Sequence, residues 1–198
     1  MKSTIAIYGA GGFGKEVRGM LETDPRFSFA GFFDDYLEQV DRVNEDMYDD
    51  VLFAIADPGI RARLVEEWTG KSVSFNALIS PDVKLHASVY VGKGSIICPG
   101  VKATVDISIG EFVIVNLNTT IGHDVRLGDF CSLMPSVNIS GSVTVGSGTF
   151  IGTGATILQG LTIGDNVIIG AGTVVTKNIP ANCTVVGVPG RVVKKNQL

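Results

Sequence analysis

His123 and Asp124 are neighbours in the sequence, and their side chains suit proton transfer. A neutral imidazole can take up a proton near neutral pH, and an adjacent carboxylate can orient the ring and strengthen it as a base. Such a pair could remove a proton from an amine or from a hydroxyl group. Because an isolated histidine is seldom functional, an ordinary polar turn is the alternative interpretation.

A second candidate site is a glycine-rich segment with the spacing G-x-G-x-x-G, formed by Gly9-Ala10-Gly11-Gly12-Phe13-Gly14. It follows an apolar segment, precedes an expected helix, and Asp34 lies twenty residues after Gly14. In this context the backbone N–H groups at the helix N-terminus bind phosphate, and the acid holds a ribose or a base edge. The alternative is a tight turn that binds nothing.

The elements around the glycine-rich segment predict a small α/β unit over residues 1–75, similar to a Rossmann fold. We expect strands at 4–8, 29–33 and 51–55, and helices at 14–21 and 59–68. Continuous apolar strands of this kind are typical of a parallel sheet that is covered on both faces. The unit is about one mononucleotide-binding half, whereas a nicotinamide cofactor needs two. A nucleoside diphosphate, as in a nucleotide sugar, therefore fits better.

The remainder of the chain repeats every six residues. Each sixth position from Val91 to Val175 is aliphatic, and the spacing extends back to Leu85 and Ile79. A period of six fits neither an α-helix nor hairpin strands, but it fits an all-β parallel solenoid whose coils turn three corners. We place this solenoid at residues 76–183, followed by a C-terminal tail at 184–198.

Residues eighteen apart should stack in successive coils, about 4.8 Å from one another. One corner then consists of glycines, which we expect because tight turns need a permissive backbone; they are Gly92, Gly110, Gly128, Gly146 and Gly164. A second corner carries Cys98, Asn116, Met134, Gly152 and Gly170. The third is chemically mixed and carries His86, Thr104, Gly122, Ser140, Leu158 and Thr176.

The mixed corner places His123 and Asp124 just after Gly122, where side chains should point outward. Gly141, one coil above, removes side-chain bulk beside the imidazole, and Asp106 lies one coil below Asp124. The other histidine, His86, lies two coils away, roughly 10 Å, so the two rings cannot share a zinc ion. The sequence therefore predicts no metal site.

Composition excludes several other classes of protein. The net charge is only -4, and the chain has no basic run long enough to suggest nucleic-acid binding. It has no stretch of eighteen apolar residues, so we expect no membrane span. The three widely spaced cysteines, Cys98, Cys131 and Cys183, suggest a reducing, cytoplasmic location.

The chain resembles a known family along essentially its whole length. The resemblance is carried by the glycine-rich turn before the hexads, by Ile121-Gly122-His123-Asp124-Val125-Arg126-Leu127-Gly128-Asp129-Phe130, and by Val186-Gly187-Val188-Pro189-Gly190-Arg191. These segments are similar to the sialic-acid O-acetyltransferase and UDP-4-amino-sugar N-acetyltransferase family (NeuD/PglD-like). The resemblance implies a left-handed β-helix and a homotrimer with the active site between subunits. It also implies acetyl-CoA in the groove between neighbouring solenoids and a nucleotide sugar on the N-terminal unit.

The resemblance also implies roles for individual residues. His123 matches the general base, and Asp124 matches the acid that modulates it. The expected CoA-binding positions are Ser132, Gly141, Thr153 and Ala171. The expected sugar-nucleotide positions are Gly11, Gly12, Phe13, Asp34, Asp35 and Ala56. Two positions depart from the family, because many members have histidine in place of Phe13 and some have it in place of Ser132.

The sequence thus favours transfer of an acetyl group from acetyl-CoA to the amino group of a UDP- or GDP-linked sugar. The same machinery acting on a hydroxyl group, as in a sialic acid, is the first alternative. A non-catalytic trimeric nucleotide-binding scaffold is the second. An NAD-dependent oxidoreductase is disfavoured by the missing half-domain.

Overall fold

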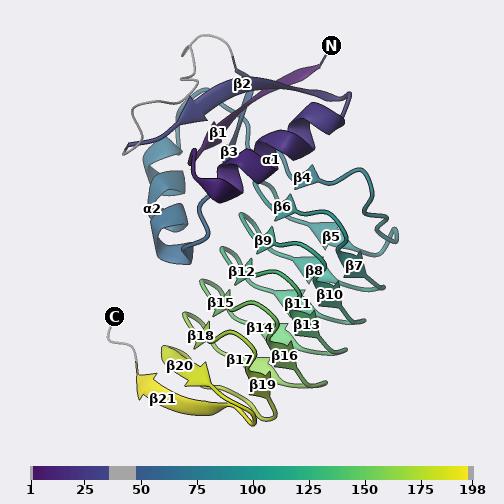
Figure 1. Cartoon of the computed structure of the whole chain (residues 1–198), viewed down its shortest axis with the longest axis vertical. Helices are drawn as coiled ribbons and strands as arrows, with labels where there is room; N and C mark the ends of the chain where they lie inside the picture. Colours follow the sequence, from purple (N-terminus) through teal and green to yellow (C-terminus); the bar gives the residue numbers. More distant parts are fainter. Residues whose placement is uncertain (1, 36–47, 196–198) are drawn as a thin grey trace.

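The computed structural model describes residues 2–35 and 48–195. It contains a small α/β unit that is followed by a parallel β-solenoid (Figure 1). Neither helix in these ranges is long and apolar enough to cross a membrane.

The N-terminal unit is built on a three-stranded parallel sheet with the strand order β2-β1-β3. The strands are β1 (Ser3–Tyr8), β2 (Phe27–Phe33) and β3 (Asp50–Phe53). Side chains of β1 alternate between two buried clusters: Ile5 and Ile7 pack with helix α1 (Gly12–Thr23), and Ala6 and Tyr8 pack with α2 (Pro58–Trp68). The sheet is covered on both faces, as its continuous apolar strands predict.

The solenoid has three faces made of two-residue strands. The wide face has eight strands and includes β4 (Leu78–Ile79), β6 (Ile96–Ile97), β9 (Ile114–Val115), β12 (Ser132–Leu133), β15 (Phe150–Ile151) and β18 (Ile168–Ile169). The Thr120 face consists of β7 (Lys102–Ala103), β10 (Thr120–Ile121), β13 (Asn138–Ile139), β16 (Thr156–Ile157) and β19 (Val174–Val175). The Arg126 face consists of β5 (Tyr90–Val91), β8 (Ser108–Ile109), β11 (Arg126–Leu127), β14 (Thr144–Val145) and β17 (Thr162–Ile163).

The register follows the predicted coil length of eighteen residues. Thr120 pairs with Asn138 and Ile121 pairs with Ile139, and the aliphatic hexad positions form one continuous core. Leu85 keeps the spacing but lies outside the strands of the described chain, so the first coil is less regular than the others.

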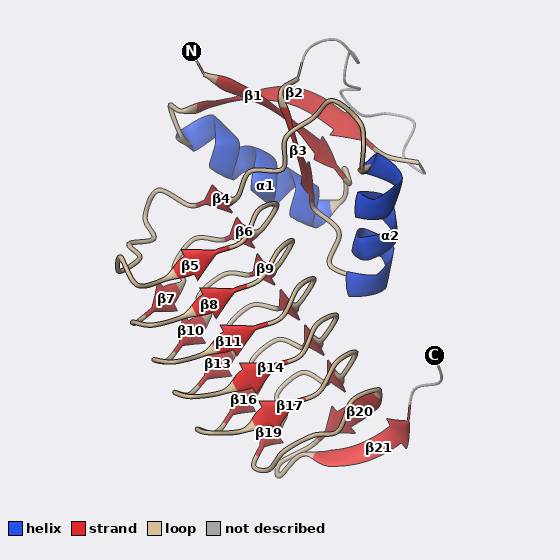
Figure 2. Cartoon of the chain, turned by 180° about the vertical axis from the view of Figure 1, so that it is seen from behind, coloured by secondary structure: helices blue, strands red, loops and turns tan. Residues whose placement is uncertain are grey.

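The N-terminal unit packs on the first coils of the wide face. Figure 2 shows α1 between the three-stranded sheet and β4 and β6. Ile96 and Ile114 belong to the same buried cluster as Val17 and Leu21 of α1. The two parts of the chain therefore share this hydrophobic contact, and Phe112 of the solenoid joins a second one with Phe53 and Trp68.

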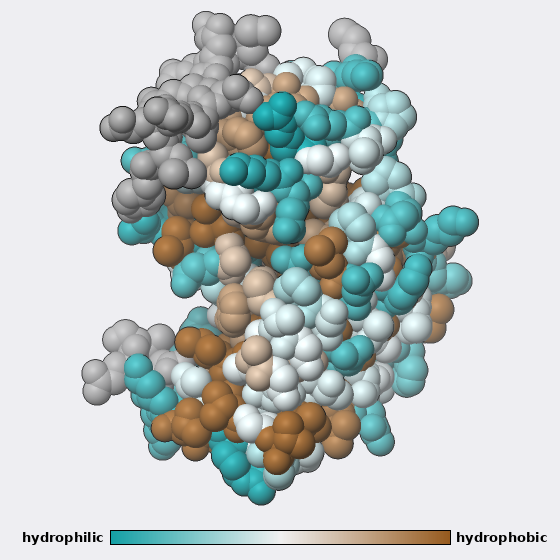
Figure 3. Space-filling model, in the orientation of Figure 1, coloured by the Kyte–Doolittle hydropathy of each residue, from teal (hydrophilic) through white to brown (hydrophobic). Residues whose placement is uncertain are grey.

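The last part of the chain continues the wide face. β20 (Cys183–Val186) pairs in parallel with β18, and β21 (Arg191–Lys195) returns antiparallel to β20. Figure 3 shows apolar side chains gathered over this end of the solenoid, where large exposed residues are Ile168, Val186, Val188, Val192 and Val193. Much of the segment expected as a tail is thus an ordered extension of the sheet.

The prediction that the five corner glycines are needed for a permissive turn backbone is wrong. None of its five glycines has a left-handed φ; the left-handed residue comes two positions later, as at Phe112 with φ 52°. A Cβ on Gly110 would instead lie 2.5 Å from Asp129 Oδ1 and 2.8 Å from the backbone of Gly128. These glycines are required because successive coils approach closely, and the turn itself accepts side chains.

Candidate active site

His123 and Asp124 lie at the corner between the Thr120 and Arg126 faces, here called the histidine corner. His123 Nδ1 is 2.7 Å from Asp124 Oδ2, and both side chains are well exposed. Consecutive residues in an extended strand point to opposite faces, but Asp124 has a left-handed φ of 58°. This turn conformation, which aspartate tolerates well, brings the carboxylate beside the imidazole.

The pairing decides which ring nitrogen is available. An ionised carboxylate only accepts hydrogen bonds, so Nδ1 carries the proton and donates to Asp124. In the neutral ring the lone pair is then on Nε2. A Cβ on Gly141 would lie 2.5 Å from that nitrogen, so the ring lies directly against the Gly141 backbone. The structure thus brings together His123, Asp124 and Gly141, and leaves Nε2 as the basic atom.

The glycine-rich turn separates into architectural and open positions. A Cβ on Gly14 would collide with the carbonyl of Gly9, so this position needs glycine for packing. A Cβ on Gly11 or Gly12 would meet nothing within 4 Å. Gly11 is the N-cap of α1 and provides no side-chain cap, so the helix N-terminus opens onto free space.

The two acids after β2 face this turn. Asp34 Oδ2 accepts a hydrogen bond from the Ala10 N–H at 2.8 Å, and Asp35 Oδ2 accepts one from the Tyr8 hydroxyl at 2.7 Å. Burial, together with the bond to Asp35, raises the pKa of Tyr8 well above its usual range, so the phenol stays protonated as the donor. One oxygen of Asp34, which we expected at a ribose, is therefore already used to hold the turn.

The expected sugar-nucleotide residues share one edge of the sheet. The glycine-rich turn follows β1, Asp34 and Asp35 follow β2, and Ala56 comes after β3. Carboxyl ends of parallel strands meet at the same edge, which is where ligands bind in open α/β sheets. The structure thus brings this group of residues together.

Ser132 has a different neighbourhood from the one expected of a CoA contact. Its side chain is fully buried, and its hydroxyl donates to the Ala56 carbonyl at 2.6 Å. The same hydroxyl accepts from Arg61 Nη2 at 3.0 Å. Ser132 therefore joins the solenoid to the N-terminal unit, and CoA would have to displace these partners to reach it.

The other two expected CoA residues, Thr153 and Ala171, stack at exposed positions of the corner between the wide and Thr120 faces. We call it the Asn116 corner; it comprises residues 98–100, 116–118, 134–136, 152–154 and 170–172. His123 and Gly141 lie at the histidine corner, on the other edge of the Thr120 face. Within one chain the expected CoA contacts are therefore divided between two corners.

Arg61 is a buried residue of the contact between the two parts that our sequence analysis missed. It is 1% exposed and lies on the buried stripe of α2 with Pro58, Val65 and Trp68. The available signal was a charged residue at an apolar position of an amphipathic helix, which implies a specific partner.

Cys98 and Cys131 are not suited to nucleophilic chemistry. Burial raises the pKa of both Cys98 and Cys131 to about 12, so neither is a thiolate at neutral pH. Within residues 2–35 and 48–195 no group of three or more His, Cys, Asp or Glu residues could hold a metal ion. His86 Nδ1 is 2.9 Å from the hydroxyl of Ser88.

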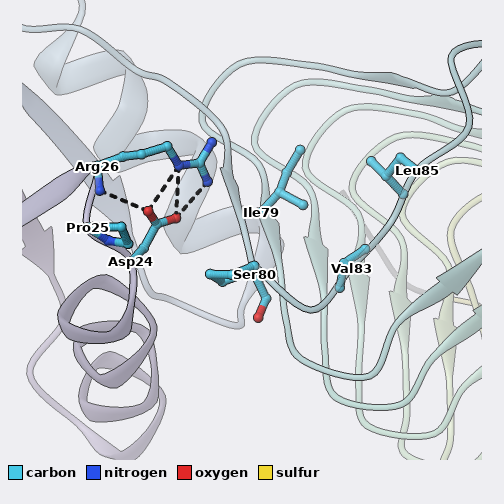
Figure 4. Close-up of a pocket in the computed structure, with 8 residues that line it drawn as sticks. Asp24, Pro25, Arg26, Ile79, Ser80, Val83 and Leu85 are labelled. Atoms are coloured by element: carbon cyan, nitrogen blue, oxygen red, sulfur yellow. Dashed lines mark hydrogen bonds and ion pairs between the residues drawn. The ribbon is translucent and has the colours of Figure 1, made fainter.

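Two pockets in the described chain are lined by residues other than the expected site residues. Figure 4 shows the larger, of about 460 Å³, between the α1–β2 connection and the first coil; Ile79, Val83 and Leu85 line it beside the Asp24–Arg26 ion pair. The other, of about 370 Å³, lies between the start of α2 and the glycine corner. Neither contains an expected site residue.

The fold is that of a hexapeptide-repeat solenoid with a small α/β unit at its N-terminus. Residues 142–177 match the bacterial transferase hexapeptide (six repeats) family, and residues 4–68 match the PglD N-terminal domain family. A comparison with curated protein sequences finds no match.

Solved structures are similar over nearly the whole chain. PerB from Caulobacter crescentus, in complex with CoA and GDP-perosamine, is 30% identical with a TM-score of 0.90, over 97% of this chain and 98% of that chain. WeeI from Acinetobacter baumannii AYE is 33% identical with a TM-score of 0.82, over 97% and 100%. The acetyltransferase domain of PglB from Neisseria gonorrhoeae FA1090, in complex with acetyl coenzyme A, is 27% identical with a TM-score of 0.89, over 98% and 100%.

The chain belongs to the PglD-like sugar acetyltransferases of the hexapeptide-repeat class. Its solenoid is the left-handed β-helix of that class. The resemblance drawn from the sequence is confirmed.

Proposed function

We propose that this protein transfers the acetyl group of acetyl-CoA to the amino group of a nucleotide-linked amino sugar, with His123 as the general base. The observation that carries the proposal is the His123 ring, whose Nδ1 is bonded to Asp124 and whose Nε2 is left as the basic atom against Gly141. Support for the co-substrate comes from similar structures that contain CoA or acetyl coenzyme A.

The proposed reaction is direct acyl transfer. The sugar amine attacks the thioester carbonyl, and His123 Nε2 takes the proton that the nitrogen loses. Asp124 stabilises the imidazolium through the Nδ1 hydrogen bond. The tetrahedral intermediate then collapses with cleavage of the carbon–sulfur bond, and the departing CoA sulfur takes up the proton that His123 had accepted. No covalent enzyme intermediate is required, which agrees with the raised thiol pKa of Cys131.

The nucleotide sugar is assigned to the edge of the N-terminal sheet. Its diphosphate would lie at the open N-terminus of α1, against Gly11, Gly12 and Phe13. Asp34, Asp35 and the segment at Ala56 would border the rest of the nucleotide. PerB, which is similar along its whole chain, is solved with GDP-perosamine, a nucleotide-linked sugar.

We further propose a homotrimer in which each active site is shared by two chains. Phe13 of the glycine-rich turn and Leu117 of the Asn116 corner pack against the same cluster, which supports assigning the sugar site to that side of the solenoid. His123 lies across the Thr120 face. Three chains arranged with their Thr120 faces towards a common axis would place the histidine corner of each beside the Asn116 corner of the next.

The side chains of the Thr120 face suit this arrangement. The first residues of its strands are Lys102, Thr120, Asn138, Thr156 and Val174, of which only the first is charged. Depletion of charge is typical of the centre of an interface. The shared groove would also bring Thr153 and Ala171 of one chain towards His123 and Gly141 of its neighbour.

The deciding experiment supplies acetyl-CoA with a UDP-4-amino sugar, with GDP-perosamine or with free sialic acid, and identifies the product by mass spectrometry. We expect an N-acetylated nucleotide sugar. His123→Ala should lower turnover by roughly 10²- to 10⁴-fold while CoA binding, measured by calorimetry, is retained. An acetate ester of sialic acid as the main product, or near wild-type turnover by the variant, would contradict the proposal.

A further inference from the structure

The contact between α2 and the solenoid is centred on a buried guanidinium. Arg61 is 1% exposed, and no ion pair joins it to a carboxylate in the described part of the chain. Burial lowers the pKa of Arg61 to about 10, which still leaves the group charged at neutral pH. A buried charge without a counter-ion is costly, so its hydrogen bonds must compensate for the lost water.

Every nitrogen of this guanidinium is bonded to the protein. Nε donates to the Phe112 carbonyl at 2.9 Å. Nη2 donates to the Phe130 carbonyl at 2.7 Å, to the Cys131 carbonyl at 3.1 Å and to the Ser132 hydroxyl at 3.0 Å. Nη1 donates to the Ile55 carbonyl. One side chain thus connects two successive coils with the end of β3.

The solenoid side of this contact is a rigid platform. Phe112 and Phe130 occupy equivalent turns of successive coils, and their rings stack with centroids 5.4 Å apart and planes 7° apart. Both have left-handed φ values, 52° and 58°. This conformation is unfavourable for a bulky residue, so it persists where the surroundings determine it strongly. The stacked pair therefore fixes the positions of the Phe112 and Phe130 carbonyl groups, which accept hydrogen bonds from Arg61.

The N-terminal side of the contact leads directly to the expected sugar site. Arg61 holds the Ile55 carbonyl, and Ser132 holds the Ala56 carbonyl at 2.6 Å. A Cβ on Gly9 would lie 2.7 Å from Ile55 Cδ1 and 3.0 Å from the Ala54 carbonyl oxygen, so the glycine-rich turn rests on this segment. A shift of Ile55 and Ala56 would therefore move the turn as well.

We propose that Arg61 and Ser132 are positioning residues that fix the position of the sugar-nucleotide site relative to the solenoid. The inference rests on the proposed function, because it assigns the segment after β3 to the sugar nucleotide. Neither residue touches the reacting atoms. They act through Ile55 and Ala56, whereas the acetyl-CoA groove involves other corners of the solenoid and does not depend on this contact.

The test compares Arg61→Lys and Ser132→Ala with Arg63→Lys, a control on the exposed face of the same helix. Lysine keeps the charge but cannot reproduce the planar fork of donors. We expect Arg61→Lys to raise KM for the nucleotide sugar roughly tenfold, and Ser132→Ala to raise it severalfold, with KM for acetyl-CoA unchanged. Hydrogen exchange should increase locally at residues 54–57, and Arg63→Lys should behave as wild type.

Binding of UDP and GDP, measured by calorimetry, separates this inference from the proposed function. If wild type binds one of them and Arg61→Lys binds it about tenfold more weakly, positioning holds even if no acetyl transfer is found. Equal affinity of wild type and both variants would overturn the inference. So would a parallel rise in both KM values with exchange increased along the whole chain. Failure of wild type to bind either nucleotide would overturn both proposals.

Discussion

The two nitrogens of His123 are controlled by different neighbours. Asp124 Oδ2 accepts a hydrogen bond from His123 Nδ1 at 2.7 Å, and the glycine at position 141 leaves room for the side of the ring that carries Nε2. The first contact depends on a left-handed φ at Asp124, and the second depends on the absence of one carbon atom one coil away. The orientation of the imidazole, and the nitrogen that it leaves available, therefore depend on the turn as well as on His123 itself.

Gly141→Ala tests this directly. The new Cβ would lie 2.5 Å from Nε2, so the imidazole must swing away. Because small misplacements of reacting groups are costly, we expect kcat to fall by on the order of a hundredfold with little loss of thermal stability. The control is Ser140→Ala, at the adjacent position of the same corner. Wild-type kcat in Gly141→Ala would show that the ring does not act from its observed position.

At the scale of elements, hexad spacing predicted the solenoid well because every coil repeats the same requirement. An aliphatic residue must enter the core at each sixth position, so one period determines register, faces and corners together. The docking of the N-terminal unit has no such repetition. It depends on Arg61, Phe112 and Phe130, single residues whose partners are more than fifty positions away, and no local pattern indicates that pairing.

The residues of the candidate site likewise divide into those that the sequence reveals and those that it does not. The dipeptide of His123 and Asp124 and the glycine-rich turn were visible in the sequence because their members are neighbours in the chain or lie in successive coils. The burial of Ser132 could not be predicted, since it depends on how the N-terminal unit and α2 lie over strand β12. A serine at an outward position of a solenoid strand is ordinarily solvent-exposed, and only the docked unit encloses it.

The connection between α1 and β2 supplies a pH-dependent contribution to stability. The buried Asp24 carboxylate accepts from Arg26 Nη2 at 2.6 Å and from the Arg26 backbone N–H at 3.0 Å. Hydrogen bonding to Arg26 lowers the pKa of Asp24 in the folded protein. The ionised carboxylate is thus favoured by folding, so its contribution is present at neutral pH and is lost as pH falls through the lowered pKa.

Asp24→Asn should therefore lower the free energy of unfolding by roughly 1 kcal/mol at neutral pH, a modest value because Arg26 is largely exposed. The difference from wild type should shrink as pH falls below the usual aspartate pKa of about 3.9 and through the lowered pKa of the folded protein, where both chains come to carry a neutral group. Urea unfolding at several pH values measures this. Glu22→Gln, at an exposed position of the same helix, is the control. A difference that does not vary with pH would contradict the assignment.

At the scale of the whole molecule, one chain presents the two halves of the proposed site on different edges of the Thr120 face. Phe13 of the glycine-rich turn packs against the same hydrophobic cluster as Leu117 of the Asn116 corner, whereas His123 lies at the histidine corner. In the trimer proposed above, this division would make assembly a condition of activity. It also makes the sharing of sites testable, because two chains with different defects should complement one another.

The two inactive variants are His123→Ala and Gly11→Leu. The latter fills space that is open around the helix N-terminus, since a Cβ there meets nothing within 4 Å, so it should block the diphosphate without disturbing the fold. Co-expression in equal amounts should restore about a quarter of wild-type activity, because each site draws its histidine and its sugar-binding turn from two independently chosen chains. Each variant alone should be inactive.

Gly19→Leu is the matched control, since a Cβ at this exposed position of α1 also meets nothing within 4 Å. It should be active alone, and its co-expression with His123→Ala should give about half of wild-type activity, because only the histidine then varies. A site contained within one chain gives a different result: both halves must then come from the same polypeptide, so His123→Ala with Gly11→Leu would regain nothing. Activity in mixed trimers thus depends on which edges of neighbouring solenoids meet, and a null result with intact trimers would rule out the shared site.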